Sequence, residues 1–440
     1  MPTTRLLDVR DRQTLTIPGA RLVVVRGPDK GSTAPVELEE MVVGSAPTAH
    51  LVLHDPTVSR HHFVLKTTPD GYVVTDLGST NGTRLDRRRI QSAFVAPGDR
   101  IDIGGTQLRL QGGDERVEVA LSPRESFGRL LGRSVAARRT FALLERVAGE
   151  PTTVLFTGES GTGKDVAAEA LHEASPRAAA PFVVVDCGAL VDNLMESELF
   201  GHEAGAFTGA REARAGAFEH AHGGTLFLDE IGELARDLQP KLLRVLERRE
   251  IRRVGAVEPR AVDVRIVAAS NRDLRVAVNN GLFREDLFHR LNVVSIRMAP
   301  LRERMDDVPL LAEHFWRELR RDPYEQLPES LLSAFLAYDW PGNVRELRNK
   351  VERGALMMGM GRSTDAISGI GEVRLDEQFP FREAKAAVVE RFERTYCRTL
   401  LERARGNVSE AARLASMNRV YLTRLLQKYG LTPWGRGESS

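Results

Sequence analysis

The hydrophobic and polar positions of this chain of 440 residues form three successive patterns. From about Leu22 to Leu110, short apolar runs such as LVVV, FVL and YVV alternate with turn residues, which predicts a β-sandwich. From about Phe127, apolar strand candidates such as TTVLF and TLFLD alternate with helical periodicity, which predicts a parallel sheet covered by helices on both faces. From Pro300 the strand pattern stops, so we expect a small helical subdomain. The tail from Glu383 is helical in pattern throughout.

These patterns predict a multidomain protein with two linkers. We place the domains at residues 20–112, 127–362 and 383–434, with linkers at 113–126 and 363–382. The stretch Gln111–Ser126, which includes the first linker candidate, is polar and contains Gly-Gly and Pro, which is typical of a connecting segment. A chain of this length is too long for a single hydrophobic core, which agrees with several domains.

Composition narrows the functional classes. Lys and Arg number 62 and Asp and Glu number 61, so any nucleic-acid signal has to be local. The two cysteines, Cys187 and Cys397, are far apart, and we expect neither a disulfide framework nor a cysteine-rich metal site. No apolar run approaches the roughly 20 residues that span a bilayer, and no signal-peptide pattern is visible. We therefore expect a cytoplasmic protein without a membrane partner.

The segment GESGTGKD follows the strand candidate TTVLF and opens the helix candidate DVAAEALHEA, which is the context that a phosphate-binding loop requires. Backbone N–H groups of the loop and the helix N-terminus would hold the phosphates of ATP, and Lys164 would add positive charge. The general motif ends in Ser or Thr for magnesium. Asp165 stands there instead, and its carboxylate could hold Mg²⁺ directly or through water. The predicted nucleotide-binding residues are Gly158, Glu159, Ser160, Gly161, Thr162, Gly163, Lys164 and Asp165.

Two acidic residues end a later strand candidate, TLFLDE, where phosphoryl transfer needs a metal ligand and a base. We assign Asp229 to Mg²⁺ and Glu230 to activation of the attacking water. The alternative, a solvated acidic strand end, is less favoured once a phosphate loop precedes it. Asn271 ends the candidate VRIVAASN, where its amide either senses the γ-phosphate or belongs to a turn.

Arg284 and Arg290 lie six residues apart in LFREDLFHRLN, on a predicted helix. Both cannot easily face their own nucleotide, so they are candidates to stabilise transition-state charge in a neighbouring subunit. The alternative is that they pair with Glu285 and Asp286.

The hexapeptide GAFTGA, at Gly205–Ala210, lies between the phosphate loop and the acidic strand end. Two glycines and two alanines around Phe207 and Thr208 suit an exposed, flexible loop. An exposed Phe suggests a contact that is made in use. A nucleotide site with an apolar loop tip suggests that ATP chemistry moves something.

The tail is locally basic, because residues 383–436 hold 11 Lys and Arg against 5 Asp and Glu, which favours phosphate contacts. In GNVSEAARLASMNRVYLTRLLQKYG a tight turn at 416–418 separates two helix candidates, with Leu422 and Leu426 facing inward. This is helix-turn-helix geometry, whose second helix enters the major groove of DNA. An ordinary helical cap is the alternative. The residues available to the groove are Arg419, Tyr421, Thr423, Arg424 and Lys428.

The segment from Gly132 to about Met358 resembles the AAA+ ATPase domain of bacterial sigma-54-dependent transcription activators. The matching stretches are GESGTGKD, ESELFGHEAGAFTGA, GGTLFLDEI, FREDLFHRLN, PLRERMDDVP and WPGNVREL. The resemblance implies a ring, usually a hexamer, with ATP sites between subunits. One position departs from the family: Asp186 stands in VVVDCGAL where Asn often restrains the catalytic glutamate, here Glu230. An Asp accepts rather than donates hydrogen bonds and would repel Glu230.

The same resemblance implies roles for residues outside the phosphate loop. Arg284 and Arg290 fall where the family has trans-acting arginine fingers, and Arg345 falls on its sensor arginine. Phe207 and Thr208 fall where the family's loop contacts the sigma factor. The C-terminal segment resembles the Fis-type helix-turn-helix, which implies binding as a dimer to enhancer DNA.

Residues from about Val42 to Leu110 resemble a forkhead-associated (FHA) domain, a β-sandwich that binds phosphothreonine peptides. The matching motifs are VSRHH, DLGSTNGT and PGDRIDIG. His62 is expected to brace a loop, and Ser45 stands where the family's early Gly-Arg carries a phosphate-contacting Arg, so one charge-assisted contact is lost. The alternative is a sandwich that serves only subunit or interdomain contacts. The residues that fall on phosphopeptide-contacting positions are Ser59, Arg60, Thr80 and Asn81.

We therefore predict a multidomain transcription activator: an all-β FHA sandwich, a central α/β AAA+ domain with a helical lid, and an all-α helix-turn-helix. Its predicted partners are sigma-54 RNA polymerase, enhancer DNA, a phosphothreonine protein and further copies of itself. A second class is a DNA-binding repressor or scaffold whose ATPase only controls assembly, which the intact GAFTGA loop disfavours. A third is an ATP-driven protein-remodelling machine, which the helix-turn-helix tail disfavours.

Overall fold

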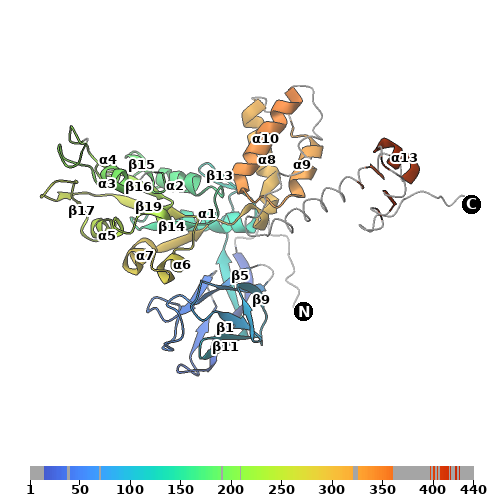
Figure 1. Cartoon of the computed structure of the whole chain (residues 1–440), viewed down its shortest axis with the longest axis horizontal. Coiled ribbons are helices and arrows are strands. Elements are labelled where there is room, and N and C mark those ends of the chain that lie inside the picture. Colours follow the sequence, from blue (N-terminus) through green and yellow to red (C-terminus); the bar gives the residue numbers. More distant parts are fainter. Residues whose placement is uncertain are drawn as a thin grey trace, which may run out of the picture. The chain divides into compact units, whose positions relative to one another are not determined.

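The structure is a computed structural model of the chain, drawn in Figure 1. It comprises two compact units, Met1–Ala355 and Leu356–Ser440. The residues that the structure describes are 14–36, 40–68, 71–189, 192–208, 210–320, 326–359, 397, 400–401, 404, 407–415, 417, 422–423 and 426.

The N-terminal part of the first unit is a β-sandwich of two sheets. One sheet has the strand order β2-β1-β11-β10-β7-β8 and the other β4-β3-β5-β6-β9. Alternate residues of the strands, such as Leu22 and Val24 in β1, turn inward to one apolar core between the sheets. The sandwich predicted from the short apolar runs is therefore confirmed. Its strands are β1 (Thr14–Arg26), β2 (Thr33–Pro35), β3 (Glu40–Gly44), β4 (Leu51–Val52), β5 (Phe63–Thr68), β6 (Gly71–Asp76), β7 (Thr83–Leu85), β8 (Arg88–Ile90), β9 (Ser92–Val95), β10 (Arg100–Ile103) and β11 (Thr106–Ala120).

Strand β11 is longer than the sequence predicts. It continues to Ala120 and pairs antiparallel with β1, where Thr14 lies opposite Ala120. Residues 113–120, which we predicted as part of a linker, therefore lie in a strand, because ladder hydrogen bonds join backbone groups and form between polar residues as well as apolar ones. Directly after the strand, Ser122 binds the central domain, since its carbonyl oxygen accepts a bond from Arg138 Nε at 2.7 Å.

The central part of the first unit is a five-stranded parallel sheet with the order β15-β16-β19-β14-β20 (Figure 1). The strand candidates TTVLF, PFVVVD, TLFLD and VRIVAAS all form strands of this sheet, and the edge strand β20 was not singled out from the sequence. The strands are β14 (Val154–Thr157), β15 (Phe182–Asp186), β16 (Thr225–Asp229), β19 (Arg265–Ser270) and β20 (Val294–Arg297). The short pairs β12 (Ser126–Phe127) with β13 (Leu130–Leu131), and β17 (Glu250–Ile251) with β18 (Arg260–Ala261), lie outside this sheet.

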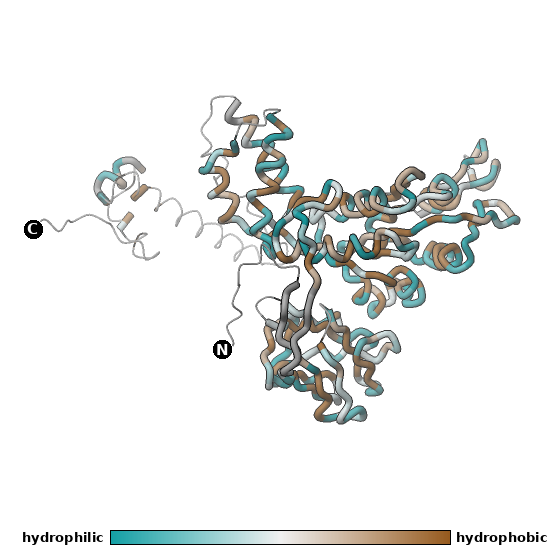
Figure 2. Tube along the Cα trace, turned by 180° about the vertical axis from the view of Figure 1, so that it is seen from behind, coloured by the Kyte–Doolittle hydropathy of each residue, from teal (hydrophilic) through white to brown (hydrophobic). Residues whose placement is uncertain are grey.

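Helices cover both faces of the parallel sheet. Phe156 and Phe227 face a cluster with α1 and α2, whereas their neighbours Leu155 and Leu226 face a second cluster with α3, α5 and α7. Figure 2 shows hydrophobic stretches along the strands of both domains. This two-sided burial explains why the strand sequences are continuously apolar rather than alternating. The helices are α1 (Val135–Ala148), α2 (Lys164–Glu173), α3 (Asp192–Phe200), α4 (Ala217–His220), α5 (Gln239–Arg248), α6 (Leu274–Asn279) and α7 (Glu285–Leu291).

A helical lid follows β20, as predicted from Pro300 onward. It consists of the 3₁₀ turns η2 (Leu301–Glu303) and η3 (Met305–Asp307) and the helices α8 (Val308–Arg320), α9 (Glu329–Leu336) and α10 (Asn343–Gly359). Trp316 and Trp340 are fully buried in it, and Trp340 Nε1 donates to the carbonyl oxygen of Phe335 at 3.0 Å. The indole N–H of Trp340 is thus satisfied inside the core, as is usual for a buried tryptophan, whereas Trp316 Nε1 has no hydrogen-bond partner among the described residues.

In the second unit the structure describes helix α13 (Val408–Leu414) and a small apolar cluster. Leu422 and Leu426 belong to this cluster together with Ala411 and Ala412. The two leucines therefore face inward, as the helix-turn-helix pattern predicts.

Candidate ATP site and contact surfaces

The phosphate loop connects β14 to α2 at the carboxyl edge of the parallel sheet. Gly161 has a φ of 78°, and a Cβ atom there would lie 2.5 Å from the carbonyl oxygen of Gly342 in the lid, so only glycine fits. Lys164 begins α2 and is 6% exposed. Its Nζ donates to the carbonyl oxygens of Gly158 and Glu159 at 3.0 and 3.2 Å. The ammonium group thus lies inside the loop, where a helix N-terminus would hold phosphates.

Glu230 contacts both Lys164 and Asn271. Glu230 Oε1 lies 3.9 Å from Lys164 Nζ, and Glu230 Oε2 accepts a bond from the backbone N–H of Asn271 at 3.0 Å. Glu230 has a φ of 48°, a left-handed conformation that is uncommon outside glycine and is often found at functional sites. The structure therefore brings Lys164, Glu230 and Asn271 together, with Asn271 contributing its backbone amide to the contact.

Asp229 ends β16 beside these residues. Burial raises the pKa of Asp229, and the neighbouring carboxylates of Asp186 and Asp165 raise it further, whereas Lys164 and the Glu230 N–H lower it. Gathered carboxylates of this kind are stabilised by a cation, and their oxygens are the ligands that Mg²⁺ prefers. Among the described residues no group of three or more His, Cys, Asp or Glu side chains could hold a metal ion alone.

Asp186 ends β15 beside the end of β16. It lies opposite Asp229 in the β15–β16 register, and its Oδ1 accepts a bond from the backbone N–H of Gly188 at 2.9 Å. The Glu230 carboxylate meanwhile contacts Lys164 and the Asn271 amide. Whether Asp186 restrains Glu230 stays a prediction.

The remaining residues of the loop brace it. Thr162 is buried, and its Oγ1 donates to the carbonyl oxygen of Glu159 at 2.8 Å. Asp165 is exposed in the first turn of α2. The carbonyl oxygen of Thr162 accepts a bond from Arg304 Nη2 at 2.9 Å, which joins the loop to the start of the lid.

Besides Arg304, two further residues that the sequence analysis did not single out attach the lid to the phosphate loop. Arg302 donates from Nη1 and Nη2 to the two carboxylate oxygens of Glu159, at 2.9 and 2.5 Å, and holds the pKa of that carboxyl below its usual range. Asn343 Nδ2 donates to Glu159 Oε2 and to the carbonyl oxygen of Ser160, each at 3.1 Å. The predicted sensor residue Arg345 donates to Ser160 Oγ at 2.8 Å. Arg302 lies in PLRERMDDVP and Asn343 lies in WPGNVREL. Their place in these two family motifs was the sequence feature that could have indicated a role at the site.

The two predicted arginine fingers make other contacts. Arg284 caps the N-terminus of α7 and forms a two-pronged ion pair with Asp286, at 3.0 and 2.6 Å. Arg290 donates to the carbonyl oxygen of Leu246 at 3.2 Å. Within the described part of the chain, neither guanidinium is recorded in contact with the phosphate loop.

The GAFTGA segment forms a protruding loop between α3 and α4 (Figure 1). Gly205 N–H donates to the carbonyl oxygen of Ala210 at 2.7 Å, which closes the loop. Phe207 is 39% exposed and its ring meets the edge of His202, with centroids 5.0 Å apart, while Thr208 is exposed. The predicted exposure of both residues is confirmed.

The loops of the sandwich that carry VSRHH and DLGSTNGT lie side by side. Thr80 N–H donates to Ser59 Oγ at 3.0 Å, and Asn81 Nδ2 donates to the carbonyl oxygen of Thr57 at 2.7 Å. His62 is fully buried, accepts the N–H of Ser59 and lies 3.4 Å from the carbonyl oxygen of Gly82, so it braces both loops as predicted.

Arg60 and Ser45 complete this edge of the sandwich. Arg60 forms an ion pair with Glu285 of α7. Ser45 Oγ donates to the carbonyl oxygen of Val58 at 3.0 Å, so this residue stabilises the loop where the family's arginine would contact phosphate.

Four of the five predicted DNA-binding residues, Arg419, Tyr421, Arg424 and Lys428, lie outside the described residues. The fifth, Thr423, lies in a helical segment and is half-buried.

Four family models match the chain in succession. They are the inner membrane component of T3SS, cytoplasmic domain (residues 23–114), the sigma-54 interaction domain (130–297), the AAA+ ATPase lid domain (302–367) and the bacterial regulatory protein, Fis family (388–429). The C4-dicarboxylate transport transcriptional regulatory protein DctD of Pseudomonas aeruginosa is 45% identical over 320 residues, which cover 72% of this chain and 67% of that protein. The chain belongs to the sigma-54-dependent transcriptional activators.

Solved structures agree with this family of activators. NtrX from Brucella abortus, crystallised in complex with ATP, is 37% identical, with a TM-score of 0.50 over 70% of each chain. The central part of this activator is an AAA+ ATPase domain, and the three-part fold class is confirmed. A solved FHA domain aligns with 22% of this chain at 26% identity and a TM-score of 0.21, a likeness too weak to carry an argument.

This activator covers between 47% and 70% of the length of the curated relatives it matches. Among the described residues no helix is long and apolar enough to cross a membrane.

Proposed function

We propose that this chain binds enhancer DNA, assembles into a ring and uses ATP hydrolysis to drive its GAFTGA loops against sigma-54 in RNA polymerase, so that the promoter opens. The observation that carries the proposal is the layout of one stretch of chain. The exposed Phe207 and Thr208 lie between β15 and β16, and those two strands end at Asp186 and Asp229 beside the phosphate loop. A change at the nucleotide would thus reach the loop through the part of the chain that joins β15 to β16 and contains α3.

The geometry of the phosphate loop supports the proposed division of roles at the nucleotide. Lys164 lies inside the loop and would neutralise the outer phosphates of ATP. Glu230, which contacts Lys164 and the Asn271 amide, would orient and activate the attacking water. Asp229 and Asp165 would hold Mg²⁺, which supplies charge compensation for the phosphates when it is bound.

The lid supports a sensing role for Arg345. Its guanidinium contacts Ser160 of the phosphate loop, and Arg302 and Asn343 grip Glu159 in the same loop. If the γ-phosphate of ATP binds between the phosphate loop and the lid, its loss on hydrolysis would change the position of the lid.

The positions of Arg284 and Arg290 support a ring. Both side chains contact groups away from their own phosphate loop, namely Asp286 and the carbonyl oxygen of Leu246. Arginines supplied by a neighbouring subunit can stabilise the transition state of phosphoryl transfer. We therefore place the ATP sites between subunits, in a ring that is a hexamer when active.

The sandwich is proposed to recognise phosphothreonine. The hydroxyl of Ser59, the guanidinium of Arg60, and the side chains of Thr80 and Asn81 come from two adjacent loops at one end of the sandwich. Hydroxyl, amide and guanidinium donors of this kind suit a phosphate group.

Two variants test the central proposal by separating hydrolysis from activation. Lys164→Ala should lose ATP turnover and promoter opening together, because the phosphates lose their counter-charge. Thr208→Ala should keep most of the ATPase activity and lose open-complex formation at a sigma-54 promoter, because only the loop contact is removed. Both reactions are measured on purified protein, polymerase and promoter DNA.

The matched control is Lys241→Ala, which removes an exposed lysine of α5 that pairs with Glu196. It should leave both readouts unchanged. Open complexes formed at the wild-type rate by Thr208→Ala would rule out the mechanical role of the loop, and hydrolysis retained by Lys164→Ala would place the nucleotide site elsewhere.

A further inference from the structure

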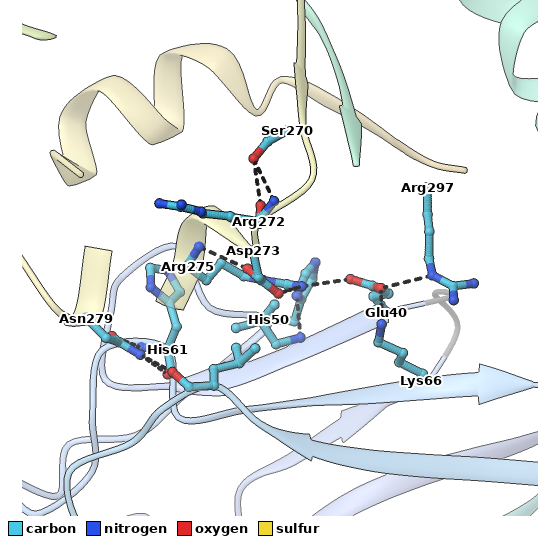
Figure 3. Close-up of polar contacts among 12 residues, drawn as sticks. Glu40, His50, His61, Lys66, Ser270, Arg272, Asp273, Arg275, Asn279 and Arg297 are labelled. Carbon is cyan, nitrogen blue, oxygen red and sulfur yellow. Dashed lines mark hydrogen bonds and ion pairs between the residues drawn. The ribbon is translucent and has the colours of Figure 1, made fainter. Parts of the chain in front are cut away.

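The sandwich and the central domain meet through segments that are far apart in the sequence. Figure 3 shows Asn279 of α6 reaching the sandwich, where its Nδ2 donates to the carbonyl oxygens of His61 and Leu77 at 2.6 and 2.9 Å. The N–H of His61 returns a bond to Asn279 Oδ1 at 3.3 Å. One asparagine therefore satisfies three backbone groups of the two loops that carry VSRHH and DLGSTNGT.

Ionic and apolar contacts extend this interface along α6. Arg275 Nη2 donates to Glu40 at 3.0 Å and to Asp273 at 2.6 Å, as Figure 3 shows. Burial alone would raise the pKa of Glu40, but Arg275 and Lys66 hold it below its usual range. The side chain of Val276 packs against an apolar cluster of the sandwich formed by Val42, Ala49, Val64 and Leu77. A buried apolar centre with polar and charged contacts around it is typical of a specific interface, and in this one the His61 Nδ1 and Glu285 Oε1 atoms are buried without a hydrogen bond among the described residues.

The same interface occupies the predicted phosphate-contacting edge of the sandwich. Arg60 forms its ion pair with Glu285, the first residue of α7. His61 is 2% exposed and stands edge-on to Phe288, with ring centroids 5.7 Å apart. Thr48 Oγ1 lies 3.1 Å from His289 Nε2. The carboxylate of Glu285 thus holds the predicted phosphate-contacting guanidinium of Arg60, and Ser45 stands where the family has another arginine.

We propose that docking of the sandwich on α6–α7 and binding of a phosphothreonine peptide are mutually exclusive, because Glu285 and the phosphate compete for Arg60. This inference rests on the proposed phosphothreonine recognition. A phosphate dianion forms stronger charge-assisted bonds with a guanidinium than a single carboxylate does. The side chain of Arg60 is 60% exposed, so the phosphate can approach it before the ion pair breaks.

The competition predicts how the sandwich would regulate the ATPase domain. Helix α7 begins one residue after Arg284 and contains Arg290, the two arginines proposed to serve a neighbouring ATP site. The docked sandwich lies on this helix through Glu285, Phe288 and His289. Phosphopeptide binding would remove those contacts and leave α7 to the neighbouring subunit, so the peptide should raise ATPase activity.

A binding measurement on the full chain tests the competition. The probe is a degenerate peptide pool with one fixed phosphothreonine, compared with the same pool unphosphorylated, and fluorescence anisotropy gives the affinity. Glu285→Gln should bind the phosphorylated pool about fivefold more tightly than the wild type, the factor that corresponds to one partly exposed ion pair. Arg60→Ala should lose this binding. Glu313→Gln, which removes the Glu313–Arg317 ion pair within α8, is the matched control and should bind like the wild type.

A second measurement keeps docking separate from phosphate recognition. Hydrogen exchange followed by mass spectrometry should show residues 58–63 and 274–291 protected in the wild type, and less protected in Asn279→Ala and on addition of the phosphorylated pool. Asn280→Ala, at an exposed position next to Asn279, should keep the wild-type protection.

The outcomes distinguish the two ideas. Protection lost in Asn279→Ala without phosphopeptide binding by any variant would show docking and sink phosphothreonine recognition, and with it the competition. Equal affinity of Glu285→Gln and wild type for the phosphorylated pool, or protection that the pool leaves unchanged, would overturn the competition alone.

Discussion

His61 is a buried histidine between the sandwich and α7. Burial, reinforced by the positive charge of Arg275, lowers its pKa to about 4, although Glu285 acts in the opposite direction. His289 lowers the pKa and Asp273 raises it, each to a smaller extent. The folded chain therefore keeps His61 neutral at a pH where an unfolded chain would protonate it.

This residue predicts a pH dependence of stability. Because the folded pKa lies below the ordinary 6.5, the unfolded chain binds the extra proton as the pH falls from 6.5 towards 4. In that window His61 lowers the free energy of unfolding by at most about 1.4 kcal/mol for each unit by which the pH falls. His61→Phe, which keeps an aromatic ring against Phe288, should lose less stability between pH 7 and pH 5 than the wild type does. Calorimetric midpoints at several pH values measure the difference.

The matched control for this prediction is His54→Gln, since the side chain of His54 is 79% exposed and pairs with Asp29 within the sandwich. A wild type and a His61→Phe variant whose midpoints fall in parallel with pH would contradict the assignment to His61.

At the scale of elements, the start of α10 depends on one asparagine. Asn343 is fully buried with a φ of 54°, and its Oδ1 accepts the N–H of Leu301 at 2.8 Å while Nδ2 binds the phosphate loop. One side chain thus joins η2, α10 and the loop. Asparagine adopts left-handed backbone angles more readily than most residues, which makes it suited to this position.

Removing that amide should loosen the lid. Asn343→Ala leaves the Leu301 N–H without its partner and places Ala in a left-handed conformation, at a cost of about 2–4 kcal/mol. Asn343→Gly should lower the free energy of unfolding by about 1 kcal/mol less than Asn343→Ala does. Glycine relieves the backbone strain but does not restore the hydrogen bonds of the amide. Urea unfolding followed by tryptophan fluorescence reports on this region, since Trp316 and Trp340 are buried in the lid.

The exposed Asn280→Ala serves as the reference for this series, with an expected midpoint equal to that of the wild type. Equal midpoints for Asn343→Ala and the reference would show that the lid does not depend on this amide.

At the scale of the whole molecule, the proposed ring makes a prediction about mixed assemblies. A Lys164→Ala subunit still carries Arg284, and an Arg284→Ala subunit still carries Lys164. Each variant alone should be inactive, whereas random mixing at equal amounts restores about a quarter of the interfaces, because each needs a loop from one variant and a finger from the other. ATPase assays on co-purified, differently tagged subunits measure the recovery.

The control is a mixture of the double variant, which carries both substitutions, with the Lys164→Ala variant. No subunit in that mixture has Lys164, so none of its interfaces can hydrolyse ATP. Mixed oligomers of the two single variants that remain inactive would place the fingers in their own subunit.

The candidate site was predictable where its residues belong to continuous motifs. GESGTGKD and TLFLDE predicted the place of Lys164 and Glu230, and the structure brings these side chains within 3.9 Å. Arg302 and Asn343 were missed because their contacts with Glu159 join positions more than 140 residues apart. The strand at 113–120 was missed because its sequence is polar, whereas ladder hydrogen bonds form between backbone groups whatever the side chains are.

By itself the sequence determined the order of the domains, the phosphate loop and the exposed GAFTGA loop, because hydrophobic periodicity and short motifs act over neighbouring residues. Only the tertiary structure decided that Arg60 pairs with Glu285 and that Asn279 binds the carbonyl oxygens of His61 and Leu77. Such contacts depend on which surfaces the packed domains bring together. Nothing in the sequence indicates that Arg60 and Glu285, which are more than 200 positions apart, form an ion pair.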